Sequence, residues 1–143
     1  MYNLYEFLGL LRFGTFSDDL FNNGVYFSTG ISMLAITLLG MTLFYVIKKH
    51  KPLTFRLTMW FIFIFVIGLI NFGIAYSLSY STLDGVYSEQ NQNLPYGFGS
   101  FAGFGLINFI YSIIFCFFIS LAIQLFFKKT HGDIPIPIRK SFK

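Results

Sequence analysis

The sequence predicts an all-α membrane protein with three transmembrane helices, and two observations lead to this fold class. Three long runs, residues 28–47, 57–80 and 104–127, contain no Asp, Glu, Lys, Arg or His. About 20 residues of helix cross a hydrocarbon core of about 30 Å, so each run is long enough to span it. In addition, nine of the ten basic residues lie directly after the first run or after the third.

The overall composition supports a membrane environment. Hydrophobic residues make up 55% of the chain and the mean hydropathy is +0.67, so a soluble domain of this size would expose a large apolar surface. The formal charge of +4 does not indicate nucleic-acid binding, because the basic residues flank the runs, where they meet anionic lipid headgroups. These predicted membrane-interface residues are Lys48, Lys49, Lys51, Arg56, Lys128 and Lys129.

The distribution of charge predicts the orientation of the chain. Short loops rich in Lys and Arg stay in the cytoplasm, which places the basic loop 48–56 and the basic tail 128–143 inside. The N-terminal segment 1–27 and the loop 81–103 carry more acidic than basic residues and belong outside. We therefore expect an N-out, C-in topology.

The N-terminal segment is not typical of a signal peptide, because it lacks a basic start and a continuous apolar stretch. Leu4, Phe7, Leu8 and Leu11 recur on one face of a helix, which predicts an amphipathic interfacial helix on the outer leaflet. Packing of this helix on the protein's own outer loop is an open alternative. Residues 14–24, with their glycines and asparagines, are expected to form the connection to the first span.

The outer loop 81–103 is rich in Gly, Ser, Asn, Gln and Tyr and contains two turn signals, Asp84-Gly85 and Pro95-Tyr96-Gly97. Its later part, from Tyr96 to Phe104, alternates aromatic and small residues. This pattern favours an aromatic belt at the level of the lipid headgroups. The glycines also leave open a close backbone contact with another chain.

Small and polar residues recur at helical spacing in the spans and predict the faces along which helices pack. In the second and third spans they are Gly68, Asn71, Ala75, Gly105, Asn108, Ser112, Cys116 and Ser120. A stripe in the first span consists of Ser28, Ser32, Ala35 and Thr42. Small residues let helices approach closely, so these stripes are expected to face protein while Phe and Ile face lipid. As a pore lining, the same residues would supply only a thin polar surface.

The second and third spans also share a five-residue sequence. The residues of Gly68–Phe72 recur as Gly105–Phe109. Internal repeats are typical of many transporters. Gly, Leu, Ile and Phe are common in apolar helices, however, so coincidence is the favoured interpretation.

No residue pattern indicates catalysis, a cofactor or a metal. All six acidic residues lie outside the three spans, whereas intramembrane chemistry depends on ionisable residues within them. His50 and His131 lack the neighbouring His, Cys or carboxylate ligands that a metal site requires. Cys116 is expected to be a small packing residue. We therefore expect a protein that is not an enzyme.

The basic tail contains an alternating Ile-Pro segment that predicts a short extended structure. Proline at every second position is incompatible with a helix and favours a polyproline-like conformation. Three isoleucines would be exposed to water unless they were covered, and a cytoplasmic partner is the favoured cover. The predicted docking residues are Ile134, Pro135, Ile136, Pro137 and Ile138.

These features together predict a small, non-catalytic subunit that anchors or helps assemble a larger membrane complex, with other subunits favoured over self-association. The outline of three spans, N-out and C-in with a basic tail, resembles that of phage holins, although no motif accompanies the resemblance. It implies the alternative of a self-associating pore. A small transporter or a membrane immunity protein is a weaker third interpretation. The bacterial inner membrane is the favoured location, with an organellar inner membrane as the alternative.

The orientation is testable by cysteine labelling of intact cells. In a Cys116→Ser background, Ser88→Cys is expected to react with an impermeant maleimide from outside, whereas Ser141→Cys is expected to react only after the cells are opened. Labelling of Ser141→Cys on intact cells would show that the orientation is reversed.

Overall fold

A computed structural model describes residues 14–50 and 57–126. This part of the chain contains no strand, and its four helices are α2 (Thr15–Asn22), α3 (Val25–His50), α4 (Leu57–Glu89) and α5 (Phe98–Phe126). The three long helices are apolar and long enough to cross a membrane, over Val25–Ile47, Thr58–Glu89 and Phe98–Ile123. The predicted all-helical class with three candidate spans is therefore confirmed for the described residues.

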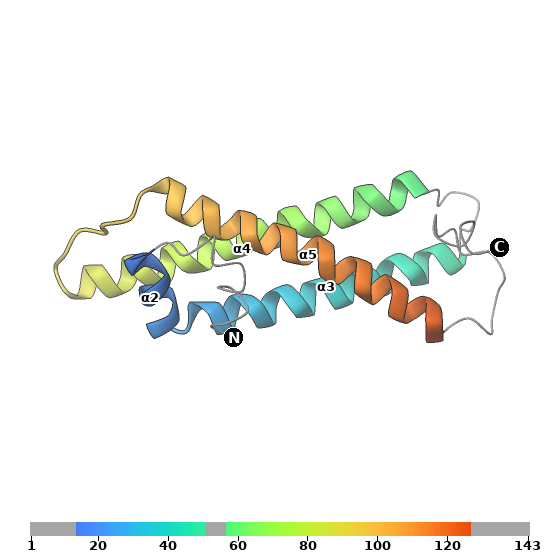
Figure 1. The fold of residues 1–143 in the computed structure, drawn as a ribbon, viewed down its shortest axis with the longest axis horizontal. Coiled ribbons are helices and arrows are strands. Elements are labelled where there is room, and N and C mark those ends of the chain that lie inside the picture. The colour runs from blue at the N-terminus through green and yellow to red at the C-terminus, as the bar shows by residue number, and fades with distance from the viewer. Residues whose placement is uncertain (1–13, 51–56, 127–143) are drawn as a thin grey trace.

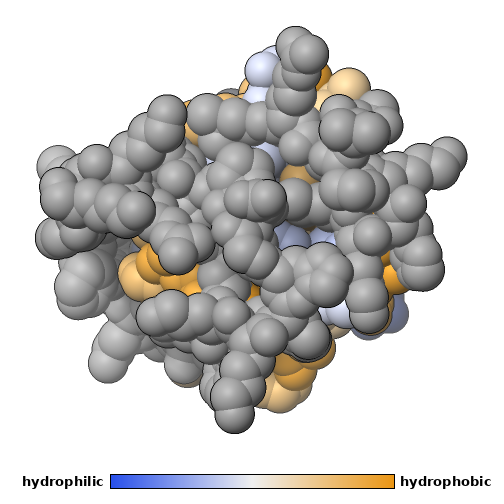
Figure 2. All heavy atoms as spheres, turned by 90° about the vertical axis from the view of Figure 1, so that its right-hand side faces the viewer, coloured by the Kyte–Doolittle hydropathy of each residue, from blue (hydrophilic) through white to orange (hydrophobic). Residues whose placement is uncertain are grey.

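The long helices form an elongated bundle in which α4 and α5 cross near their middles, while α3 runs along one side (Figure 1). The short helix α2 lies at one end of this bundle, beside the last part of α4. We call this end the α2 end. Seen from the opposite end, patches of hydrophobic atoms of the described residues show beside more polar ones (Figure 2).

The crossing of α4 and α5 is built from the repeated five-residue sequence. A Cβ atom added at Gly68 would lie 2.8 Å from the ring of Phe109, and one added at Gly105 would lie 2.9 Å from the ring of Phe72. Real Cβ atoms do not approach other atoms so closely, so each glycine makes room for the phenylalanine of the other copy. The expectation that Phe residues of the spans face lipid is wrong for Phe72 and Phe109, whose rings fill these gaps.

Helix α4 continues well beyond the apolar run that predicted it. Its 33 residues correspond to about 50 Å at 1.5 Å per residue, compared with about 30 Å of hydrocarbon. The turn predicted at Asp84-Gly85 is wrong, because both residues lie inside the helix. The helix ends where Asn91 adopts φ 54° and the Gln92 N–H donates to the Tyr87 carbonyl at 2.9 Å, which is the pattern of a Schellman motif.

The C-terminal extension of α4 is covered by α2. The sequence predicted a connecting segment, not a helix, for these residues. Phe16 and Leu20, one turn apart, are buried in a cluster with Leu83 and Phe101. Gly24, at φ 68°, provides the left-handed conformation that lets the chain turn from α2 into α3. Burial of these apolar side chains, rather than intrinsic helix propensity, stabilises so short a helix.

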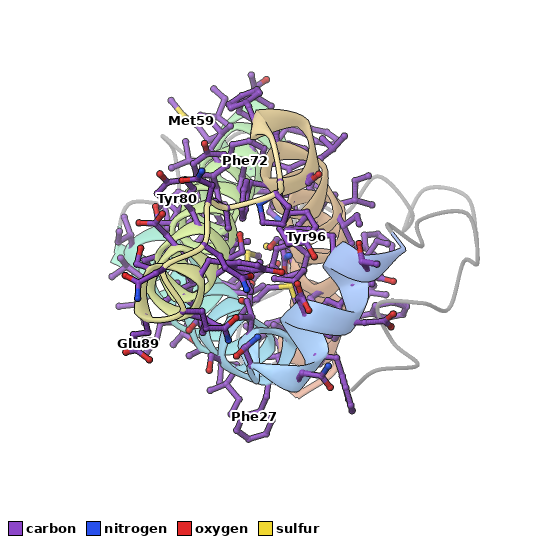
Figure 3. The ribbon with its side chains drawn as sticks, turned by 90° about the vertical axis from the view of Figure 1, so that its left-hand side faces the viewer. Phe27, Met59, Phe72, Tyr80, Glu89 and Tyr96 are labelled. Carbon is purple, nitrogen blue, oxygen red and sulfur yellow. The ribbon has the colours of Figure 1, made fainter. Side chains whose placement is uncertain are left out.

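Asp19 ties α2 to the neighbouring segments through two tyrosines. The Tyr87 hydroxyl, from α4, donates to Asp19 Oδ2 at 2.7 Å, and the Tyr96 hydroxyl, from the connection to α5, donates to the same oxygen. Figure 3 shows Tyr96 beside α2 when the bundle is viewed from this end. Burial, together with the hydrogen bond to Asp19, raises the pKa of Tyr96, so its hydroxyl stays protonated as the donor.

The aromatic residues at the start of α5 divide between the interior and the surface. Tyr96 is bonded to Asp19, and Phe101 and Phe104 are fully buried. Phe98, the first residue of α5, is 73% exposed. The predicted aromatic belt from Tyr96 to Phe104 is therefore wrong for Tyr96, Phe101 and Phe104, which pack on α2, α3 and α4 instead of on lipid.

The glycine contacts predict opposite outcomes for the same substitution at two places in α4. Gly68→Ala is expected to lower the free energy of unfolding by about 1 kcal/mol, since overpacking typically costs about 1–3 kcal/mol and exceeds the gain in helix propensity. Gly85→Ala meets no atom within 4 Å and is expected to raise it by about 0.5–1 kcal/mol. Circular dichroism during thermal unfolding in detergent measures both. A Gly68→Ala variant as stable as wild type would contradict the packing.

The Asp19 contacts predict a local effect on α2. Asp19→Ala removes the acceptor of two hydroxyl donors, so the amides of α2 are expected to exchange with deuterium about tenfold faster. The neighbouring Asp18 is exposed and makes no such contact, so Asp18→Ala serves as the control with little change. Equal exchange rates in the two variants would show that Asp19 does not hold α2.

Candidate membrane-facing interaction site

The predicted packing residues of the second and third spans all lie inside the bundle of a single chain. Every one of them is buried, so the small and polar side of α5 faces α3 and α4. The buried set is Gly68, Asn71, Ala75, Gly105, Asn108, Ser112, Cys116 and Ser120. The interior of one chain therefore uses the stripe that a multi-chain pore would need as its lining.

The polar side chains of this interior are bonded mainly within their own helices. Thr37 Oγ1 donates to the Met33 carbonyl at 2.6 Å, Asn108 Nδ2 donates to the Phe104 carbonyl at 2.9 Å, and Ser112 Oγ donates to the Asn108 carbonyl at 2.7 Å. Asn71 reaches another helix: its Nδ2 donates to Thr37 Oγ1 at 3.4 Å. These local bonds satisfy hydroxyl and amide groups that are buried between the helices.

Two apolar clusters lie on either side of this polar region. One, at the α2 end, contains Phe16, Leu20, Phe101 and Phe104 among others. The other contains Met41, Ile64, Ile67 and Cys116. The buried polar groups are thus interrupted along the bundle and do not form a continuous polar path within one chain. Among the described residues, no group of three or more His, Cys, Asp or Glu side chains is placed to hold a metal ion.

The stripe predicted for the first span lies on the outside of α3, which corrects that prediction. Ser28, Ala35 and Thr42 are exposed and Ser32 is half-buried. The buried positions of α3 instead include Val25, Tyr26, Thr29, Met33, Thr37, Met41 and Phe44. Both sets have helical spacing, and the larger side chains occupy the interior because they fill the space between α4 and α5.

Ser32 of α3 and six residues of α4 line an open groove of about 600 Å³. Its lining is Ser32, Leu69, Ile70, Gly73, Ile74, Ser77 and Leu78. A Cβ atom added at Gly73 would have no atom within 4 Å, so the space above this glycine is empty of the chain's own side chains. The groove lies within the candidate spans, where its surroundings would be lipid or another helix.

The serines of the groove differ in their hydrogen bonds. Ser32 Oγ donates to the Ser28 carbonyl at 2.8 Å and is therefore satisfied by its own helix. Ser77 is exposed and makes no hydrogen bond to the described residues. The Ser77 hydroxyl is therefore able to donate to a partner that offers an acceptor.

The remaining predicted residues lie at or beyond the limits of the described chain. The backbones of Lys48 and Lys49 belong to the last turn of α3, and the structure does not describe their side chains. Lys51, Arg56, Lys128, Lys129 and the docking segment Ile134–Ile138 lie outside the described residues, as does the predicted amphipathic helix from Leu4 to Leu11. These remain predictions from sequence.

Comparison of the chain with protein-family models, with curated proteins and with solved structures finds no match. The three long apolar helices are consistent with an integral membrane protein. Within the described bundle, packing between the helices leaves the groove at Gly73 unfilled.

Proposed function

We propose that this protein is a small, non-catalytic membrane subunit, and that its α3–α4 groove receives a transmembrane helix of another subunit. The observation that carries the proposal is the open space at Gly73. A Cβ atom added at Gly40, Gly68 or Gly105 would lie less than 3 Å from a side chain of a neighbouring helix. Close packing therefore explains those three glycines. Gly73 lowers the stability of α4 by about 1 kcal/mol, and no side chain of a neighbouring helix packs against it in compensation.

The chemistry of the groove suits a helix better than a polar ligand. Gly73 and Ser77 are four residues apart on one side of α4, which is the small-xxx-small spacing that brings transmembrane helices into close contact. Leu69, Ile70 and Ile74 form apolar walls around them. The Ser77 hydroxyl supplies one donor to a backbone carbonyl of the docked helix.

The position of the chain in the membrane follows from its charges. In this proposal the α2 end lies outside, and the basic segments 48–56 and 128–143 lie in the cytoplasm of a bacterial inner membrane. The Ile134–Ile138 segment then adds a second contact, to a cytoplasmic part of the same assembly. Two contacts on opposite sides of the membrane suit an anchoring or assembly subunit.

The holin-like pore is the second candidate, and the bundle supports it less well. A pore requires a polar surface that several copies can turn towards a common lumen, but Asn108, Ser112 and Ser120 are buried within one chain. The surface that remains for other copies is mostly Leu, Ile and Phe. Pore formation would therefore require the α4–α5 crossing to open.

The groove is tested by filling it. Gly73→Leu is expected to raise the free energy of unfolding of the isolated chain by about 0.5–1 kcal/mol, because the space is open and Leu is the better helix former, but to weaken the heteromeric complex at least about tenfold. Gly85→Leu, at a second open glycine of α4, is the matched control and should leave the complex intact. The measurement is quantitative co-purification from the native membrane in mild detergent, with a differently tagged second copy of the chain co-expressed. It detects binding to other subunits and binding between copies of this chain.

Four outcomes decide between the candidates. Loss of a defined complex with Gly73→Leu but not with Gly85→Leu supports helix docking, and loss with the triple variant Ile134→Ser, Ile136→Ser and Ile138→Ser supports the tail contact. Retention of the complex by Gly73→Leu refutes the groove. Co-purification of the second tagged copy alone, with dye leakage from vesicles containing the chain, would favour the pore.

A further inference from the structure

An aromatic surface lies on α4 and α5 near the α2 end and is separate from the groove. The rings of Tyr76 and Tyr80 are parallel within 2°, with centroids 6.5 Å apart. Phe98 adds a third ring, 5.8 Å from Tyr76. Tyr80 is 44% exposed and Phe98 is 73% exposed, so these rings present area to the surroundings. We call these three residues the aromatic face.

The aromatic face is held from within by a buried ring. Phe101, fully buried, lies 6.0 Å from Tyr76 and 5.4 Å from Tyr80, with edge contacts to both. The two tyrosines therefore keep their relative orientation without a hydrogen bond of their hydroxyls to the described residues. A preformed arrangement of rings lowers the entropic cost of binding a ligand.

A carboxylate lies next to these rings on the same side of α4. Asp84 follows Tyr80 by four residues and Tyr76 by eight, and side chains at this spacing share one helix face. Asp84 is half-buried and has neither a hydrogen bond nor an ion pair with the described residues. The described side chains include no Lys, Arg or His, so in this part of the chain its charge is not neutralised.

The depth of the aromatic face matches the headgroup region. Counting about 20 residues of hydrocarbon crossing from the start of the α4 span at Thr58 reaches the level of Tyr76 and Tyr80. Phe98, at the beginning of α5, contacts Tyr76 and so lies at the same level. In Figure 3, Tyr80 lies on α4, away from Tyr96 and α2, so α2 does not cover it.

We propose that Tyr76, Tyr80 and Phe98, together with Asp84, bind an ammonium group. Ring faces attract cations, and the attraction is largest where water is partly excluded. The Asp84 carboxylate adds a charge of the opposite sign about one helical turn further out. Such an ammonium group is present in the choline and ethanolamine headgroups of zwitterionic lipids, and also in small soluble amines.

The experiment compares lipids that differ in the ammonium group alone. The full chain in detergent is titrated with dihexanoyl phosphatidylcholine, phosphatidylethanolamine and phosphatidylglycerol, and bound lipid is counted by native mass spectrometry. The two ammonium lipids are expected to bind at least about fivefold more tightly than phosphatidylglycerol. Tyr80→Leu and Asp84→Asn should each remove most of this preference, whereas Tyr80→Phe, which keeps the ring, should retain it.

Phe27→Leu is the control, because Phe27 is a 60% exposed aromatic residue at the same end that points away from the bundle (Figure 3). Competition by tetramethylammonium chloride at millimolar concentration identifies a soluble amine as a sufficient ligand, and absence of competition with retained lipid preference identifies the headgroup within its lipid. Equal binding of the three lipids, or equal preference in Phe27→Leu, Tyr80→Leu and Asp84→Asn, overturns the proposal. Circular dichroism of each variant separates loss of binding from loss of fold.

Discussion

Two reciprocal contacts, Gly68 with Phe109 and Gly105 with Phe72, determine how α4 and α5 lie against each other. Between helices surrounded by lipid there is little hydrophobic driving force, so close van der Waals packing has to hold them together. Two glycine gaps filled by two rings fix both the rotation and the relative depth of the helices. The other features of the α2 end depend on this register, because it leaves the last turns of α4 beyond the start of α5. Those turns provide the surface on which α2 packs, and they bring Asp19 within reach of Tyr87.

The interior of the bundle is more polar than its lipid-facing surface, and the hydrogen bonds explain how this is tolerated. Thr37, Ser79 and Ser112 donate to carbonyls of their own helices, so burial leaves these hydroxyls satisfied. Between the long helices, Asn71 Nδ2 donates to Thr37 Oγ1 and the Trp60 indole N–H donates to Ser120 Oγ. The Oδ1 atom of Asn71 is buried without a partner among the described residues, which costs about 1–3 kcal/mol. The small size of these residues, more than their polarity, accounts for their position between the helices.

The sequence predicted the spans well because length and absence of charge suffice for that purpose, but it could not predict where the helices end. Helix α4 passes through Asp84-Gly85, since burial of Leu83 against α2 outweighs the local turn preference, and it ends at Asn91, whose left-handed conformation no apolar pattern reveals. The same limitation concealed α2, although the pair Phe16 and Leu20 carried a weak signal. In the first span, two stripes had helical spacing, and side-chain volume decided which was buried. The repeated Gly68–Phe72 sequence was visible, but its meaning required knowing that the two copies lie opposite each other.

The two proposed contacts share one helix, which has a consequence for how they would act together. Gly73 and Ser77 lie in the groove, and Tyr80 and Asp84 follow on nearly the same side of α4, one and two turns further towards the α2 end. A helix seated in the groove and continuing outward would therefore pass beside the aromatic face and change the space and the water content there. Any such change in ammonium affinity must appear, by the same factor, in the affinity for the docked helix, since coupling between two binding sites is reciprocal. The headgroup composition of the surrounding membrane would then influence assembly through α4. The bound headgroup would not need to touch the part of the groove in which Gly73 lies.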